Sequence, residues 1–311
     1  MKYKTLFIFF ILVAVIINLN AQHKDAGTTG FAFMKMNFSA RAMGMSNAFT
    51  GLSNDGDAVF FNTAGLAQTN KHQLKSTYMN HFDSLQGGAI VYNTDYNDDW
   101  KIAPFIKFLV SDDITRTDTE GLNIGTFNTF SSITGIGFAR TINDALDIGF
   151  NLMYFYEKLD EFTASAVVFD FSVLHQTNNP NLKLGATLKN VGSQMTYYTE
   201  SEYNERLPLT FVVGAGYNIS DKTFLTFDLI KHVDHDFYGK FGAEFLYNSY
   251  FAIRAGFDTR MNDYKVGQSN EFMSGLSMGV GFNWQNHSID FATASMGGLG
   301  LVNQISVSYL F

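Results

Sequence analysis

Apolar and polar residues alternate along most of this chain from about residue 72 onward. Within residues 251–258, for example, every second residue is apolar or aromatic: Phe251, Ile253, Ala255 and Phe257. The residues between them include Arg254 and Asp258. Successive side chains of a β-strand point to opposite faces, so a period of two predicts strands with one apolar face and one polar face.

Fourteen segments carry this alternation: 72–81, 86–94, 100–110, 130–142, 145–156, 162–175, 182–191, 208–219, 223–231, 237–247, 250–258, 272–285, 287–295 and 302–311. A tilted strand crosses a bilayer with roughly 9 to 11 residues, close to the length of these segments. Bacterial single-chain barrels have an even number of antiparallel strands. The pattern therefore predicts an all-β fold, a 14-stranded antiparallel transmembrane β-barrel over residues 72–311.

The polar faces of these strands carry many ionisable side chains: Lys101, Lys107, Asp147, Asp170, Lys183, Lys189, Asp228, Lys240, Glu244, Arg254 and Asp290. A soluble two-sheet sandwich would have to bury either these charges or the aromatic face. A membrane barrel places the charges in a wet lumen and the aromatic residues in lipid, so outer-membrane lipid is an expected partner. The 32 Phe, 15 Tyr and 27 Gly residues fit aromatic girdles and small lumen-facing side chains.

The connections between the segments also alternate in length. The longest ones, at residues 111–129, 192–207 and 258–271, all follow odd-numbered strands, whereas turns such as 143–144 follow even-numbered ones. Long external loops facing short periplasmic turns produce this asymmetry, which predicts that both ends of the mature chain lie in the periplasm. Tyr309 and Phe311 end the last strand on its aromatic face, as expected of a signal for the outer-membrane assembly machinery.

The first 21 residues are typical of a cleaved signal peptide, because Lys2 and Lys4 precede an apolar run and the small Ala21 marks a cleavage point. Export and the barrel pattern together predict the outer membrane of a Gram-negative cell. The formal net charge is −8 before the two lysines are removed, which argues against nucleic acid as a partner. The chain has no cysteine, so disulfides and thiolate nucleophiles are excluded.

Residues 22–71 show no paired alternation and are rich in glycine and small residues. We expect them to form a plug segment or short helices inside the lumen of the barrel. Arg41 would then be buried, and a buried guanidinium needs a carboxylate, for which Asp170, Asp228, Glu244 and Asp290 are the candidates.

The run FSARAMGMSNAFTGLSNDGDAVFFNTAGLA, residues 38–67, resembles the N-terminal signature of the PorV/PorQ family in the FadL-like superfamily. The matching positions are Arg41, Gly44, Asp55, Asp57, Asn62, Ala64, Gly65 and Leu66. Thr63 stands where the family pattern has proline. The resemblance implies an accessory or cargo-docking component of type IX protein secretion, with secreted cargo or other secretion proteins as partners. Its alternative implication is a FadL-like channel for hydrophobic small molecules such as fatty acids.

Pro104 lies within a predicted strand and has no backbone N–H to donate to a neighbouring strand. It marks either a lateral opening into the bilayer or a local bulge. The external loops 111–129 and 192–207 are either docking surfaces, with Tyr203 among the exposed tyrosines, or plain solvated loops.

No pattern in the chain predicts an enzyme. Residues 275–279 match G-x-S-x-G, but they continue a strand, whereas a nucleophile elbow needs a strand-to-helix turn. His232, Asp234, His235 and Asp236 cluster in one loop, where solvated side chains are the simpler interpretation. We expect no cofactor and no metal.

Overall fold

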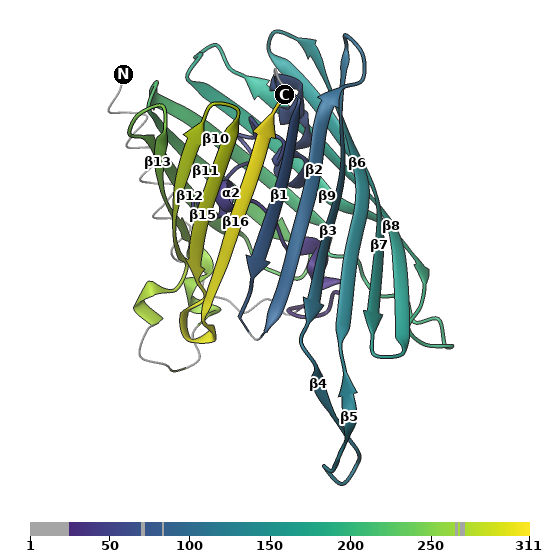
Figure 1. Ribbon diagram of the computed structural model, residues 1–311. Helices are drawn as coiled ribbons and strands as arrows, with labels where there is room; N and C mark the ends of the chain where they lie inside the picture. The colour runs from purple at the N-terminus through teal and green to yellow at the C-terminus, as the bar shows by residue number, and fades with distance from the viewer. Residues whose placement is uncertain (1–24, 70–71, 83, 265–266, 268–270) are drawn as a thin grey trace.

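The computed structural model describes residues 25–69, 72–82, 84–264, 267 and 271–311. Fourteen antiparallel strands close into one barrel in chain order, and the first pairs with the last (Figure 1). The barrel strands are β1 (Gln73–Asn80), β2 (Leu85–Asp95), β3 (Trp100–Ser111), β6 (Thr129–Asn143), β7 (Leu146–Leu159), β8 (Phe162–Gln176), β9 (Leu182–Thr196), β10 (Thr210–Ser220), β11 (Thr223–His232), β12 (Tyr238–Leu246), β13 (Phe251–Asp258), β14 (Leu276–Trp284), β15 (His287–Ser295) and β16 (Leu301–Leu310).

These strands confirm the fourteen segments predicted from the alternation, and the two largest differences are in β9 and β14. Strand β9 runs further than expected, to Thr196, and β14 begins at Leu276 because a short 3-10 helix, η4 (Glu271–Met273), occupies the predicted first turn. The loop predicted at 111–129 contains an additional hairpin of β4 (Ile114–Thr117) and β5 (Asn123–Phe127), which projects beyond the barrel (Figure 1). These strands are too short to produce a clear alternation. The predicted signal peptide lies outside the described residues.

Outward and inward side chains differ as the alternation requires. Outward residues such as Ile253, Val280 and Trp284 are about half exposed, while the inward Asp228, Glu244 and their neighbours are buried. Among the described residues, no helix is long and apolar enough to cross a membrane.

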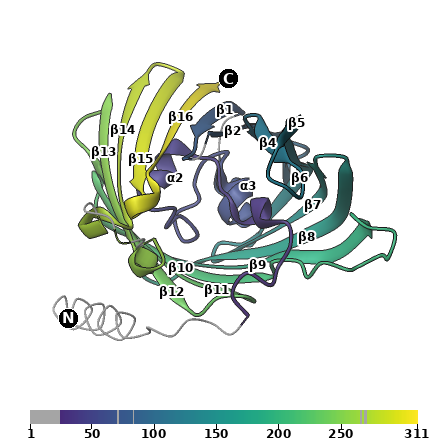
Figure 2. The same ribbon diagram turned by 90° about the horizontal axis from the view of Figure 1, so that it is seen from below.

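Residues 31–69 lie inside the barrel (Figure 2). They form η1 (Ala32–Lys35), α2 (Ala40–Met43), α3 (Ala58–Phe61) and η2 (Thr63–Gln68). The Ser39 side chain caps α2, and strand side chains bond its first turn from outside: Gln304 accepts from the Ser39 backbone N–H at 2.8 Å and Ser306 from that of Ala40 at 2.9 Å. We call residues 38–69 the plug and residues 25–37, which precede it, the strap.

A belt of inward glycines receives the plug. At each of them an added Cβ would meet the plug backbone or its first side-chain atoms, and they are Gly149, Gly185, Gly214, Gly216, Gly242, Gly256 and Gly279. At Gly185 the Cβ would lie 2.3 Å from the Thr50 carbonyl oxygen, and at Gly149 it would lie 2.4 Å from the Ala64 nitrogen. The plug therefore packs backbone against wall, which explains much of the glycine content.

Seven charged groups join the plug to strands β1, β12, β13 and β15. The Arg41 guanidinium donates twice to Glu244, at 2.9 and 2.7 Å, and once to Asp55 at 3.0 Å. Arg254 links Glu244, at 2.6 Å, to Asp290, at 2.7 Å. Lys75 pairs with Asp55 and Asp57. Arg41 therefore has the buried carboxylate partner that the sequence analysis required, and that partner is Glu244.

The strap and the C-terminus lie at opposite ends of the barrel. The Gly30 N–H bonds the carbonyl of Arg206, in the long connection after β9, whereas the Phe311 N–H bonds the carbonyl of His72, before β1. We call these the loop end and the turn end. The prediction that both ends of the mature chain lie on one side is wrong for the described residues. Alternation within strands carries no signal for how the preceding segment runs through the lumen.

Glu244→Gln should lower the free energy of unfolding by about 3–5 kcal/mol, because it leaves buried guanidinium groups without their shared charge. Asp95→Asn, which breaks the exposed Lys101–Asp95 pair at the turn end, should cost about 1 kcal/mol or less. Urea unfolding in detergent micelles measures both. Equal losses would show that the network does not anchor the plug.

Gly185→Val should destabilise the barrel by roughly 1–3 kcal/mol or more, because the new side chain overlaps the Thr50 carbonyl. Ala255→Val, on the lipid-exposed face, adds comparable volume without meeting the plug. Both variants are heated to a series of temperatures and run on a gel without boiling, and the temperatures at which the folded band disappears are compared. A Gly185 variant as heat-resistant as the Ala255 variant would contradict the packing role of the belt.

Candidate functional site

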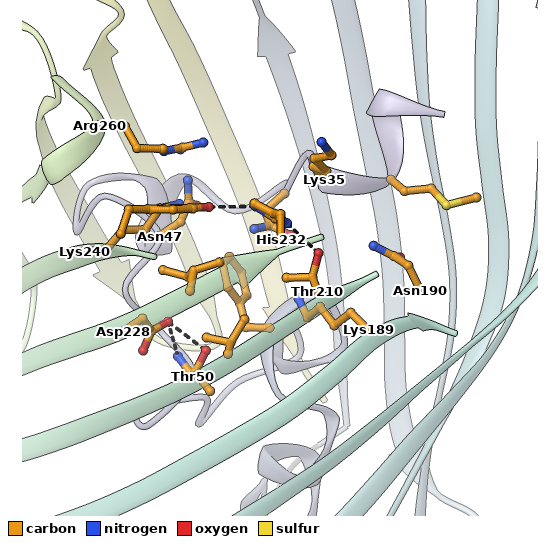
Figure 3. A pocket seen from close by; sticks show the side chains of 16 residues that line it. Lys35, Asn47, Thr50, Lys189, Asn190, Thr210, Asp228, His232, Lys240 and Arg260 are labelled. Carbon is orange, nitrogen blue, oxygen red and sulfur yellow. Dashed lines mark hydrogen bonds between the residues drawn. The ribbon is translucent and has the colours of Figure 1, made fainter. Parts of the chain in front are cut away.

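A cavity of about 90 Å³ lies between the plug, the strap and strands β9 to β12 (Figure 3). The strap and the plug contribute polar and charged lining residues, namely Lys35, Asn37, Asn47 and Thr50. The barrel and the loop after β13 contribute Lys189, Asn190, Thr210, Asp228, His232, Lys240 and Arg260. Figure 3 shows Lys189, Lys240 and Arg260 around this space, with Asp228 turned to the plug. The lining therefore carries more cationic than anionic groups.

A second, smaller cavity of about 20 Å³ adjoins the first and has an apolar wall of Phe60, Phe105, Ile133 and Met153. Met34, Asn37, Lys189 and Asn190 line both cavities and separate them. An apolar pocket thus lies around Phe105 and Met153, but most of its space is filled by the protein's own chain.

The strap supplies the aromatic groups that fill the apolar side of the lumen. The Phe31 ring lies 4.8 Å from that of Phe155, and Phe33 packs 6.0 Å from Phe38. Phe31 has a φ of 56°, a left-handed conformation that costs a bulky residue about 1–3 kcal/mol. Such strain persists only where surrounding contacts hold the residue in place.

Asp234, in the loop after β11, holds the strap at two points. One of its carboxylate oxygens accepts from the Thr29 hydroxyl at 2.7 Å and from the Lys35 ammonium at 2.6 Å. Burial raises the pKa of Asp234, but the bonds from Lys35 and Thr29 outweigh it and hold the pKa below its usual value. We call the contacts of Asp234 with Thr29 and Lys35 the latch. A depressed folded-state pKa means that this stabilisation is lost only as the pH falls below the usual aspartate range, so the latch stays closed at mildly acidic pH.

Two lysines of the lumen contact the plug and strap through backbone carbonyls. Lys107 donates to the Met36 carbonyl at 2.7 Å and lies over the Phe33 ring, and Lys189 donates to the Phe60 carbonyl at 2.5 Å. Neither ammonium has a carboxylate within 4.0 Å in the part of the chain that the structure describes. Carbonyl dipoles and aromatic faces replace full counter-charges here.

His232 belongs to a chain of hydrogen bonds beside the cavity. The Thr210 hydroxyl donates to the Pro208 carbonyl at 2.8 Å, so it accepts from the His232 Nδ1–H at 2.5 Å. The remaining ring nitrogen, Nε2, then accepts from the Tyr238 hydroxyl at 2.8 Å. With its proton committed to Pro208, Thr210 is not an activated nucleophile.

The predicted His and Asp cluster is dispersed by the fold. His232 points inward, Asp234 holds the strap, and His235 pairs with Asp263 at 2.9 Å. Within the described ranges, no three His, Cys, Asp or Glu side chains are placed to hold a metal ion.

The positions of the family motif cluster in the plug. Gly44 packs on Gly279, Asn62 donates to the carbonyls of Thr50 and Val173, and a Cβ on Gly65 would lie 1.8 Å from the Ser53 carbonyl oxygen. Ala64 and Leu66 are fully buried. Thr63, in place of proline, begins η2 and its hydroxyl donates to Asn151 at 2.9 Å, which anchors this turn to β7.

Ser277 and Pro104 both remain within strands. Ser277 lies in β14 and bonds the Ser46 backbone at 2.8 Å, so the G-x-S-x-G match is part of the plug contact. Pro104 faces outward, and its pairing with β6 is continuous, but the ladder between β2 and β3 omits Pro104 and Ala103 and resumes at Ile102. Phe311 lies against Tyr309 and Tyr92 at the turn end.

Sequence reasoning missed the strap and its partner Asp234. Asp234 was assigned to a solvated loop, because its two partners are about 200 positions away in the chain. The same distance hides the Asp228 site, where the Phe49 and Thr50 backbone N–H groups and the Thr50 hydroxyl all bond one carboxylate oxygen. The inward position of Asp228 was the only available signal.

No protein-family model matches this chain, and no curated protein matches its sequence. Solved structures do match its fold. CymD, described as a monoaromatic hydrocarbon channel, aligns with a TM-score of 0.64 and 12% identity over 88% of this chain and 98% of CymD. The toluene transporter TodX of Pseudomonas putida aligns with a TM-score of 0.59 and 11% identity over the same shares. A FadL homologue of Pseudomonas aeruginosa gives 0.55 and 12%, again over 88% and 98%.

At these identities the likeness establishes the fold. It supports the FadL-like part of the resemblance seen in the sequence, whereas membership of the PorV/PorQ family stays a prediction. The matched structures are transport channels rather than enzymes. The chain therefore has the fold of FadL-like outer-membrane channels.

Proposed function

We propose that this protein is an outer-membrane channel that admits hydrophobic small molecules, and that its strap is the gate. The observation that carries the proposal is the occupied lumen: Phe31, Phe33 and Met34 of the strap lie where a greasy molecule would contact Phe105 and Phe155. The protein's own apolar side chains stand in for a ligand there. The fold that it shares with hydrocarbon channels supports this assignment.

The strap is held less strongly than the plug. The strap is held by apolar packing, by the carboxylate of Asp234, by the Lys107 ammonium on the Met36 carbonyl and by the Gly30 N–H on the Arg206 carbonyl, whereas the plug is held by the glycine belt and seven charged groups. Leaving also releases the backbone strain at Phe31. A ligand that takes the place of the strap therefore needs to replace fewer interactions than one that displaces the plug.

Weakening the latch should open the channel. In cells that lack other channels for hydrophobic compounds, Asp234→Asn should raise uptake of a radiolabelled aromatic hydrocarbon or long-chain fatty acid about fivefold, the change in population expected for about 1 kcal/mol. Lys101→Met, which removes an exposed pair at the turn end, serves as the control. Uptake by the wild type no higher than in channel-free cells would refute the channel, and an unchanged Asp234 variant would refute the latch.

A lateral exit at Pro104 remains part of this proposal. The interrupted ladder between β2 and β3 supports it, because Pro104 cannot donate and the two strands are not paired there. Pro104→Val restores a donor and should reduce uptake several-fold if molecules leave sideways. Ile106→Val, on the same outward face of β3, is the matched control. Equal uptake by both variants would identify Pro104 as a local irregularity.

A second candidate is docking of secreted proteins, as the sequence motif of residues 38–67 implies. The hairpin β4–β5 favours it, since it projects from the loop end and exposes Leu122 and Ile124 by 61% and 58%. Deleting residues 114–127 should remove secreted proteins that co-purify with the barrel from native membranes while leaving small-molecule uptake intact. Unchanged co-purification would exclude the hairpin as the docking surface.

A further inference from the structure

The beginning of the strap lies among the long loops. Thr29 bonds Asp234 in the loop after β11, the Gly30 N–H bonds the Arg206 carbonyl at 3.2 Å, and Asp25 lies 4.0 Å from the Arg206 guanidinium. Loops after β9 and β11 both belong to the loop end. Three separate contacts thus place this part of the strap at the same end of the barrel.

Residues 26–28 are exposed there. Ala26, Gly27 and Thr28 form a turn closed by the Thr28 N–H on the Asp25 carbonyl, and a Cβ on Gly27 would meet nothing within 4 Å. The turn therefore stands clear of the wall and the loops around it.

From this turn the chain descends the whole lumen. Lys107 of β3 holds Met36, Ser306 of β16 holds α2, and Gln68, the last residue of η2, donates to Asp147 at 2.9 Å near the turn end. The first barrel strand, β1, then starts at the turn end. Residues 25–28 do not reach back to the turn end. Four extended residues span only about 14 Å, and the plug fills the lumen between the two ends.

The orientation of the barrel decides what this means. Outer-membrane barrels place their long loops outside the cell and their short turns in the periplasm. Here the connections after β3, β9 and β13 are the long ones, and the C-terminal Phe311 lies at the opposite end.

We propose that residues 25–28 are displayed on the outer surface of the cell, so that the strap and the plug together cross the membrane through the lumen of their own barrel. The proposal is independent of what the channel carries.

The chain offers a clean test because it contains no cysteine. Single cysteines are introduced by Ala26→Cys in the strap, Glu120→Cys in the hairpin at the loop end, and Asp221→Cys in a turn at the turn end, all at exposed positions. A maleimide that cannot cross the outer membrane is applied to intact cells and to cells whose outer membrane has been permeabilised. Heat-modifiable gel mobility checks that each variant is folded.

Cysteines at positions 26 and 120 should be labelled to the same extent in intact and permeabilised cells, and that at position 221 only after permeabilisation. If the cysteine at position 26, like the one at position 221, is labelled only after permeabilisation, residues 25–28 lie in the periplasm and the proposal is overturned. Absence of labelling at position 26 under both conditions would show that the turn is covered, which also overturns it. Labelling of position 221 but not 120 in intact cells would overturn the orientation on which it rests.

Discussion

The closure of the backbone ladder between β1 and β16 is the constraint on which the other features depend. Gln73 to Asn80 pair with Leu310 to Asn303 without a break, so the sheet has no free edge. In lipid, backbone groups have no water to bond, and only a closed sheet satisfies them all. Closure sends every inward side chain into one enclosed lumen, where charges must find partners within the protein.

The lumen solves that problem with the N-terminal segment. Inward glycines on six strands let the plug backbone approach the wall, and Arg41 connects Glu244 of the wall to Asp55 of the plug. The same charges that exclude a soluble sandwich thereby become anchors. A plug held in this way is a poor candidate for wholesale movement, so any gating falls to the more weakly held strap.

The contacts of the strap and the cavity support the channel proposed above. The hydroxyl of Thr210 and the imidazole of His232 are committed to fixed hydrogen bonds, whereas Phe31 is strained and replaceable. Lys107 and Lys189 bond carbonyls of the strap and plug rather than carboxylates. The polar and apolar halves of the lumen meet at Met34, a residue of the strap itself.

The sequence by itself determined the strands, because alternation of side chains is a local property. In residues 251–258, for example, the apolar and polar faces can be assigned from these eight residues alone. It also indicated that Arg41 needs a buried carboxylate, and the structure chose Glu244 from four candidates. Only the tertiary structure decided the direction of the strap, the role of Asp234 and the site of the cavity. Those depend on contacts between residues about 200 positions apart, and no local pattern records which segment fills a closed lumen or from which end it enters.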